Sequence, residues 1–412
     1  MPASTSVRPR PSSLADGTIF QPRRPAFWVY LVTLGATGFV LLGEQSFFHR
    51  ISPVGWLLSW GLLTIYALPV FLLVYVLDLY EREPLSLVIG ATLWGAIAAT
   101  TLAGYANDGW GLVVARVGGP AFAARWTAAL TAPFVEETLK GLGVVLIYLI
   151  APGEIDDMMD GFVYGAVCGL GFAVVEDVFY FMGVFGGRPS GVLEGFFVRV
   201  VASGLYSHVL YTGLVGMGIG YFVSRRERRS RGRRIAVVAG LSAVAVLAHL
   251  LWDSPLLDLF PARPWSGSDW LVIPLATAVK GFPLLVFVAV AVVLARRRER
   301  KWLHAALAGE IGDTGVSAAE LRVLEHPRNR RAAVRDMRRR AGSRAGGLLR
   351  RLQREQVTLA MVRSKVAVDD DPALVAQRTY CASLRDALRA IPGAAPADAS
   401  GPASSDAGPT GR

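Results

Sequence analysis

The sequence predicts an all-α membrane protein, a bundle of about eight transmembrane helices with a small helical cytoplasmic extension at the carboxyl end. Hydrophobic residues make up 53% of the 412 residues and charged residues only 18%, and the mean hydropathy is +0.41. The apolar residues come in long blocks rather than in the periodic patterns of amphipathic helices or half-buried strands. Length and composition therefore place the chain in a bilayer.

The apolar blocks give the expected spans in order. A helix needs about 20 apolar residues to cross a hydrocarbon core of about 30 Å, and seven or eight blocks are long enough. We expect no cleaved signal peptide, because the first block starts late and lacks a small-residue cleavage site followed by soluble sequence. The expected spans are residues 27–42, 54–80, 84–103, 127–150, 161–185, 198–223, 235–252 and 271–295.

Basic residues beside the spans predict the orientation, because cytoplasmic loops collect Lys and Arg. The strongest markers are "SRRERRSRGRR" at 224–234 and "RRRERK" at 296–301. Counting back from these loops puts both termini in the cytoplasm of a multi-pass plasma-membrane protein. The acidic loop at 152–161, which lacks Lys and Arg, would also lie inside.

The segment after the last span predicts a helical cytoplasmic extension. Ser317 and Glu320 form a capping-box pattern, and Asp371 followed by Pro372 opens another helix that reaches about Ile391. The region between them is helical in pattern and very basic. We expect a disordered cytoplasmic amino terminus at 1–24, a transmembrane domain at 25–300, a basic helical region at 301–392 and a disordered tail at 393–412.

The net charge of +11 needs no nucleic-acid partner. Most of the excess lies in one juxtamembrane loop and the extension, where anionic lipid headgroups would attract it. The two cysteines, Cys168 in a span and Cys381 in the extension, predict no disulfide framework.

Ionisable residues inside the expected spans point to a functional site. A charge at membrane depth costs about 2.5–3.5 kcal/mol even on lenient scales, so such groups face the bundle interior. At about 1.5 Å per residue from the cytoplasmic ends of their helices, groups on four helices lie ~21–26 Å up, in one layer toward the outer half of the membrane. The layer contains Glu136, Glu137 and Lys140 on one span, followed by Glu176, His208 and His249 on three others.

The helix faces support a single site. Glycines recur every four residues on the fifth expected span. On the sixth, the four-residue stripe is Gly204, His208, Thr212, Gly216 and Gly220, so His208 lies on a face where helices pack closely. Lys140 is within one turn of both Glu136 and Glu137, so it can hold one carboxylate ionised while the other acts as a base. The sequence leaves open which glutamate is the base.

Two hydrolytic routes fit these residue types. Either His208, His249 and a glutamate, for which Glu176 is the candidate, hold a divalent metal such as Zn²⁺ that activates water, or a glutamate and a histidine deprotonate water directly. The chain has no H-E-x-x-H pattern, so spacing alone is weak support for the metal.

Four short motifs resemble those of the PrsW family of intramembrane proteases, relatives of the CAAX prenyl proteases. They are "EETLK" at 136–140, "GFAVVED" at 171–177, "SHVLYTG" at 207–213 and "HLLWD" at 249–253. The resemblance covers about residues 133–255 and extends in topology over 27–296. It implies a hydrolytic centre made by the glutamate pair, Glu176 and the two histidines, within a protease domain at 25–300. Asp177 stands where the family pattern has Asn.

The implied activity is cleavage of membrane-anchored protein substrates, including release of anti-sigma factors by a cut on the outside. An outer-half site, expected from depth alone, suits this activity. Two other classes stay open: a proton- or ion-coupled transporter that uses the same buried Glu and His residues, and a catalytically silent scaffold whose basic extension recruits a partner. Transporters of this kind often contain inverted repeats, and the sequence shows no repeated half.

Other polar residues have plainer interpretations. Asp177 points about 100° away from Glu176, which favours a supporting or structural role. Asp253, one turn from His249, either orients that imidazole or meets the outer interface. We expect Lys280 to be snorkelling or structural and Cys168 to be a small buried residue.

Overall fold

The computed structural model describes residues 17–76, 83–202, 208–224, 230–255, 269–312, 315–366 and 368–394. The described residues up to 296 form one compact unit, the membrane unit, and those from 297 onward form a second, the tail unit. Within these ranges every regular element is a helix, and Ile311 and Val316 make an isolated β-bridge. The all-α prediction is confirmed.

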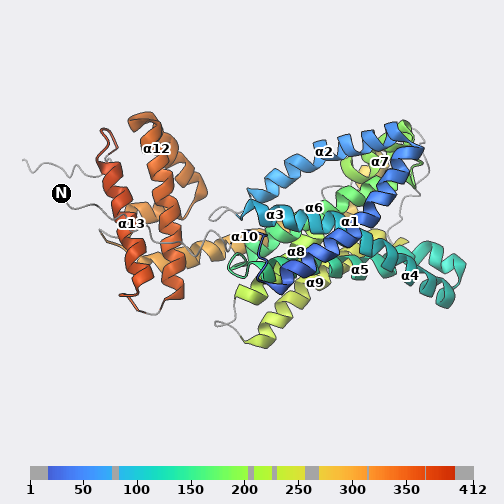
Figure 1. Cartoon of the computed structure of the whole chain (residues 1–412), viewed down its shortest axis with the longest axis horizontal. Helices are drawn as coiled ribbons and strands as arrows, with labels where there is room; N and C mark the ends of the chain where they lie inside the picture. Colours follow the sequence, from blue (N-terminus) through green and yellow to red (C-terminus); the bar gives the residue numbers. More distant parts are fainter. Residues whose placement is uncertain are drawn as a thin grey trace, which may run out of the picture. The chain divides into compact units, whose positions relative to one another are not determined.

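The first half of the membrane unit consists of a helical hairpin followed by a broken pair of helices. Ser52 separates the first two helices and donates a hydrogen bond from its hydroxyl to the Gly187 carbonyl over 2.7 Å. Gly119, with φ of 81°, turns the chain between the last two helices in a conformation that favours glycine. The elements are α1 (Pro25–Ile51), α2 (Pro53–Tyr75), α3 (Leu85–Leu93), the π-helix η1 (Trp94–Ala99), α4 (Thr100–Gly118) and α5 (Pro120–Ile150) (Figure 1).

The second half of this unit supplies the central helix and the helices beside it. Asp157 caps the central helix α6 through a reciprocal capping box with Asp160. The elements are α6 (Met158–Met182), α7 (Pro189–Phe196), the π-helix η2 (Phe197–Val201), α8 (His208–Ser224), α9 (Arg231–Asp253) and α10 (Asp269–Ala308).

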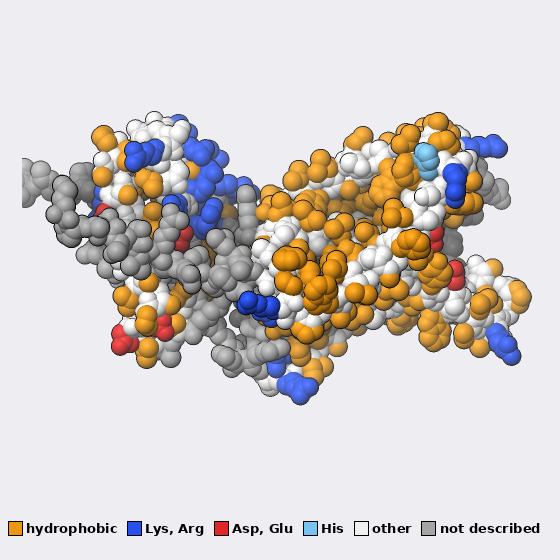
Figure 2. Space-filling view, in the orientation of Figure 1, with side chains coloured by type: hydrophobic (Ala, Val, Ile, Leu, Met, Phe, Trp, Pro, Cys, Tyr) orange, Lys and Arg blue, Asp and Glu red, His pale blue; other side chains and the backbone are white. Residues whose placement is uncertain are grey.

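Among the described residues, six helices are long and apolar enough to cross a membrane. They cover Pro25–Ile51, Pro53–Tyr75, Leu85–Gly118, Met158–Met182, Arg231–Asp253 and Ala278–Ala308. Hydrophobic side chains cover most of the visible face of the membrane unit (Figure 2), as a lipid-facing surface requires. The chain is a multi-pass membrane protein, and the full count of eight spans stays a proposal.

The two other expected spans do not meet these criteria within the described residues. The 31-residue helix α5 is long enough, but it carries Glu136, Glu137 and Lys140 in its middle. The 17-residue helix α8 is apolar but short, and residues 203–207 before it lie outside the described residues.

Several of the expected span boundaries change in the structure, and the fifth expected span, 161–185, is the helix Met158–Met182. The third expected span, 84–103, runs on as helix through η1 to Gly118, and the eighth, 271–295, is part of the 40-residue helix α10. Apolarity marks where a helix enters lipid, whereas backbone hydrogen bonding continues past that point.

The glycine stripes bring α6 and α8 into backbone contact. A Cβ atom added at Gly161, Gly165 or Gly169 would lie 2.1–2.2 Å from a carbonyl oxygen of α8. At Gly169 that oxygen belongs to His208. The close approach therefore fixes the height of His208 beside the central helix.

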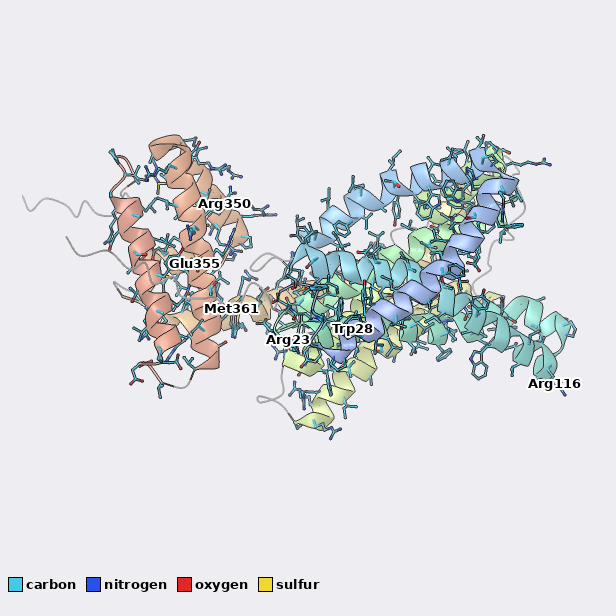
Figure 3. The ribbon with its side chains drawn as sticks, viewed as in Figure 1. Arg23, Trp28, Arg116, Arg350, Glu355 and Met361 are labelled. Carbon is cyan, nitrogen blue, oxygen red and sulfur yellow. The ribbon has the colours of Figure 1, made fainter. Side chains whose placement is uncertain are left out.

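The tail unit is a small helical domain with its own core. Its elements after α10 are α11 (Ala318–Leu324), α12 (Pro327–Lys365) and α13 (Pro372–Arg389). The capping box of Ser317 and Glu320 forms as expected, and Asp371 caps α13. Gln377 on α13 donates hydrogen bonds to the carbonyl and side chain of Glu355, which is labelled on α12 in Figure 3.

The expected disordered ends fall mostly outside the described residues, which omit 1–16 and 395–412. Residues 17–24 form turns before α1, where the Ile19 amide donates to the Ser86 hydroxyl over 3.4 Å.

Candidate active site

Three charged residues of α5, Glu136, Glu137 and Lys140, form a buried ion-pair cluster. The side chain of Lys140 has no solvent exposure, and its Nζ lies 2.6 Å from Glu137 Oε1 and 3.5 Å from Glu136 Oε2. Their spacing of three and four residues places all three on one helix face. This ion pairing was expected from the sequence.

Both histidines reach the α5 cluster from other helices. His208, the first residue of α8, and His249 on α9 place their ring centroids 5.0 Å apart. His208 Nδ1 lies 2.8 Å from the Lys140 ammonium. His249 Nδ1 lies 3.2 Å from Glu137 Oε1, and its Nε2 lies 3.3 Å from Asp253 Oδ2. Asp253 therefore orients His249, one of the two roles expected for it.

The contact with Lys140 fixes the hydrogen on His208. An ammonium has three donors and no acceptor, so Nδ1 must supply a lone pair and Nε2 must carry the hydrogen. Nε2 then donates to Glu176 Oε2 over 3.1 Å. His208 thus links α5 to the carboxylate of the central helix.

Arg199 on η2 holds the acidic pair of α6. Its Nε donates to Asp177 Oδ1 over 2.5 Å, and its Nη2 donates to Glu176 Oε2 over 2.7 Å. The guanidinium also stacks on the Tyr180 ring, 3.6 Å from its centroid. Asp177 therefore supports Glu176 through a shared arginine, a residue that the sequence analysis missed although it is a charge in an expected span.

Two further polar contacts were also missed. Asn107 on α4 donates from Nδ2 to Glu136 Oε1 over 3.1 Å, and Thr212 on α8 donates to Glu137 Oε2 over 2.9 Å. Asn107 lies beyond the apolar block that defined the third expected span. Thr212 is one turn from His208 on the small-residue stripe, which was the available signal.

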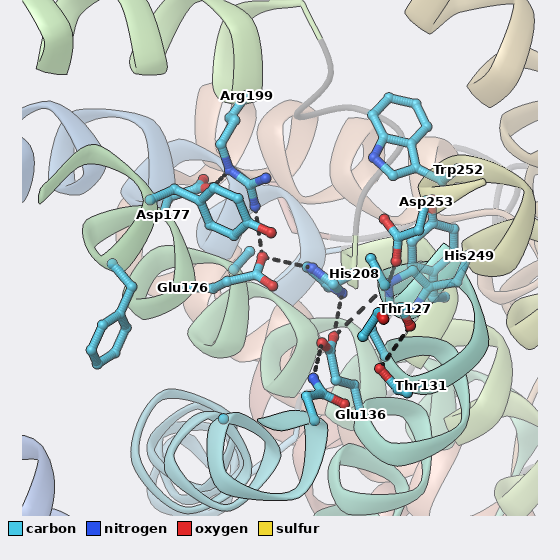
Figure 4. Close-up of a pocket in the computed structure, with 18 of the residues that line it drawn as sticks. Thr127, Thr131, Glu136, Glu176, Asp177, Arg199, His208, His249, Trp252 and Asp253 are labelled. Atoms are coloured by element: carbon cyan, nitrogen blue, oxygen red, sulfur yellow. Dashed lines mark hydrogen bonds and ion pairs between the residues drawn. The ribbon is translucent and has the colours of Figure 1, made fainter. Parts of the chain in front are cut away.

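A pocket of about 640 Å³ opens onto these groups. Figure 4 shows Glu136, Glu176, His208 and His249 converging at its floor, with Arg199 and Asp177 on one side and Thr127 and Thr131 on another. Glu176 is the most accessible of the three glutamates, with 18% of its side chain exposed against 4% for Glu136 and 2% for Glu137. Glu176 is therefore the glutamate that the pocket leaves most open, beside a buried polar centre.

Three of the converging residues form a group that could hold a metal ion. Ligand atoms of Glu136, His208 and His249 all lie within 4.8 Å of one another, and all three residues are buried. Glu136 Oε2 is buried and accepts no hydrogen bond, and the cation that it faces is the Lys140 ammonium, 3.5 Å away. Two imidazoles and one carboxylate are a donor set suited to Zn²⁺, so the residues fit a divalent metal.

The carboxylate in this group differs from the one expected. The sequence placed Glu176 with the two histidines, but Glu176 pairs with Arg199 and accepts from His208 Nε2. Glu136 takes its place because Asn107 holds one of its oxygens and leaves the other facing the rings. Spacing along the chain could not distinguish these carboxylates, which lie at the same depth.

The remaining singled-out residues lie at the edge of the site or behind it. Cys168 is buried, and its thiol donates to the Lys140 carbonyl over 3.5 Å. Lys280 donates to the Trp252 carbonyl over 3.4 Å, a structural contact.

Comparison with known proteins gives the family. A sequence model described as "PrsW family intramembrane metalloprotease" matches residues 83–295. Protease PrsW of Bacillus subtilis (strain 168) is 27% identical over 185 residues, which cover 45% of this chain and 76% of that protein. Protease PrsW of Geobacillus kaustophilus (strain HTA426) is 31% identical over 201 residues, which cover 48% of this chain and 72% of that protein. No solved structure shows significant similarity to the chain.

The matched region contains the whole convergent centre, from Asn107 on α4 to Asp253 on α9. The four motifs, the buried Glu–His–His group and the family match therefore indicate the same kind of protein. This chain belongs to the PrsW family of intramembrane metalloproteases and is a peptidase.

Proposed function

We propose that this protein hydrolyses peptide bonds of membrane-anchored protein substrates at the pocket between α4, α5, α6, α8 and α9. The observation that carries the proposal is the buried group of Glu136, His208 and His249 at the floor of that pocket. Anti-sigma factors, implied by the family resemblance, are the substrate class to test first.

The residues divide the chemistry among them. Glu136, His208 and His249 would hold a divalent metal such as Zn²⁺, which supplies a Lewis acid that acidifies water and polarises the substrate carbonyl. Glu176, the most accessible glutamate, takes the proton from the attacking water and passes it to the leaving amine. This assigns the base to Glu176 and the ligand to Glu136, the reverse of the division expected from the sequence.

Arg199 keeps Glu176 in place, while Asp253 orients His249. Glu137 holds Lys140 and accepts from Thr212, so it supports the centre from behind. These supporting contacts fix the reacting groups before a substrate arrives, which lowers the cost of reaching the transition state.

The orientation completes the proposal. We place the protein in the plasma membrane with both termini on the cytoplasmic side. The site then lies in the outer half of the membrane and would cut its substrate outside or near the outer leaflet. The basic tail unit and the loop at 224–234 then face anionic lipid headgroups at the inner surface. Lys and Arg side chains gather on the visible face of the tail unit (Figure 2), and the sequence of α12 is rich in arginine, which supports this placement.

A membrane-tethered reporter tests the reaction. Cells that co-express the reporter with wild-type protein should release its outer fragment, and Glu136→Gln and His249→Ala should abolish release. Glu44→Gln, the same substitution on α1 at a residue that does not line the pocket, should leave release unchanged. A chelator should inactivate the purified wild-type protein, and added Zn²⁺ should restore it.

Reporter release that persists in both Glu136→Gln and His249→Ala would contradict the proposal. The transporter would be favoured instead if liposomes containing the wild-type protein showed a proton flux, if both variants lacked this flux, and if no cleavage occurred.

A further inference from the structure

The structure assigns Lys140 a second role, which rests on the metal site proposed above. We infer that its ammonium and the metal ion compete for one lone pair, that of His208 Nδ1. Lys140 must therefore withdraw from His208 before a divalent cation can use all three ligands.

The competition follows from the geometry of the imidazole. A neutral imidazole has one acceptor nitrogen, and on His208 that nitrogen is Nδ1, 2.8 Å from Lys140 Nζ. Nε2 faces the other way and donates to Glu176. Nδ1 is also the nitrogen nearer to Glu136, 3.8 Å from its Oε2. A metal shared with Glu136 must bind at the atom that Lys140 already contacts.

Charge makes the two cations mutually exclusive at this point. The ammonium is fully buried, and its nitrogen lies only 3.5 Å from Glu136 Oε2, the free oxygen of the candidate ligand group. A metal ion bound to that oxygen would therefore lie close to the ammonium, and inside a protein two such positive charges repel far more strongly than in water. The same carboxylate and imidazole cannot satisfy both.

The Lys140 ammonium can move away from His208 and still keep other favourable contacts. Its Nζ lies 2.6 Å from Glu137 Oε1 and 4.2 Å from the centre of the Phe172 ring, a favourable cation–π partner. Withdrawal keeps these two contacts and gives up the bond to His208 and the 3.5 Å ion pair with Glu136 Oε2. Glu137 is then the permanent partner of Lys140, which explains why the motif has two adjacent glutamates with different surroundings.

The test measures metal binding directly, apart from proteolysis. Full-length protein in detergent is titrated with Co²⁺, whose visible absorption reports coordination, and with Zn²⁺ against a chromophoric chelator. Lys140→Met removes the ammonium at similar length, and Lys140→Gln is a second neutral variant if the first does not fold. Lys280→Met is the matched control, because it removes a lysine from a span outside the centre. His249→Ala identifies binding at this site.

We expect Lys140→Met or Lys140→Gln to bind both ions at least tenfold more tightly than the wild type, with Lys280→Met at the wild-type level. Equal affinities in the wild type and the folded Lys140 variants would overturn this inference alone. Weaker binding in those variants would also overturn it, because Lys140 would then support the ligands. Absence of His249-dependent binding in every variant would overturn both the inference and the proposed metal site.

Discussion

Single side chains outside the four motifs determine how the motif residues are presented. Asn107 holds one oxygen of Glu136 and leaves the other free, and Arg199 joins Glu176 to Asp177. Removal of such supporting partners typically costs 10–100-fold in metal affinity or activity. Both residues therefore give sharp tests of the centre.

Asn107→Ala should lower proteolysis by about 10–100-fold while the protein still folds, because Glu136 can then turn away from the histidines. The measurement is the initial rate of cleavage of a purified substrate, together with Zn²⁺ affinity. Leu112→Ala, a truncation on α4 at an exposed residue that does not line the pocket, is the control. An unchanged rate in Asn107→Ala would show that Glu136 needs no such support.

Arg199→Lys should lose most of the activity, although it keeps the positive charge. A lysine has one nitrogen and cannot donate to Asp177 and Glu176 in the fixed geometry that the guanidinium provides. We expect the cleavage activity of Arg199→Ala to be lower still. If Arg199→Lys cleaves substrate at the wild-type rate, the positive charge alone holds Glu176 in place and the double contact of the guanidinium is not needed.

At the scale of helices, the contact between α6 and α8 sets the site. Gly165 lets the two backbones approach so closely that a Cβ there would lie 2.2 Å from the Thr212 carbonyl oxygen. The chain carries Glu176 on one of these helices and His208 on the other. Separation of the helices would therefore pull apart the bond between those two side chains.

Gly165→Ala should lower the stability of the membrane unit by about 1–3 kcal/mol, the usual cost of overpacking a core, and should also reduce activity. Thermal unfolding in detergent is the measurement. Gly43→Ala on α1 provides the control, since a Cβ there meets nothing within 4 Å. Equal melting temperatures for the two variants would mean that α6 and α8 separate freely.

Sequence patterns predicted the helices better than the way charged side chains pair. Long apolar blocks, the Ser317 capping box and the Asp371 cap identify helices because their signals are local. The depth estimate also placed Glu136 and the histidines in one layer, where the structure brings them together. It could not choose between Glu136 and Glu176, because that choice depends on Asn107 and Arg199, which approach from other helices.

At the scale of the whole chain, the tail unit is held by its own ion pairs. Burial alone would raise the pKa of Glu320, but hydrogen bonds from Arg385, the Ser317 amide and Gln356 lower it below its ordinary value. The bidentate contact with Arg385 at 2.8–3.1 Å joins the start of α11 to α13. A carboxylate with a lowered folded-state pKa stabilises the fold while it is ionised.

The tail unit should therefore lose stability in acid. The contribution of Glu320 is fully present above its unfolded pKa of about 4.3 and disappears as pH falls through the lower folded value. Hydrogen exchange of α11 and α13 in the full-length protein, corrected for intrinsic rates, measures this. Glu320→Gln should be less protected than the wild type at pH 7, with the gap closing in acid. A gap that stays constant with pH would exclude this carboxylate as the cause.

The tight junction of α6 and α8 limits how a bulky segment can enter the cleft. Glu176 and His208 lie on α6 and α8, whose backbones are in contact. These two helices cannot separate to widen the pocket without losing their packing. The opposite wall carries Asn107 and Thr127 from α4 and α5, which meet at a glycine turn. Displacement of α4 and α5 would widen the pocket without breaking the packing of α6 on α8, so we expect a chemical cross-link between α4 and α6 to slow cleavage.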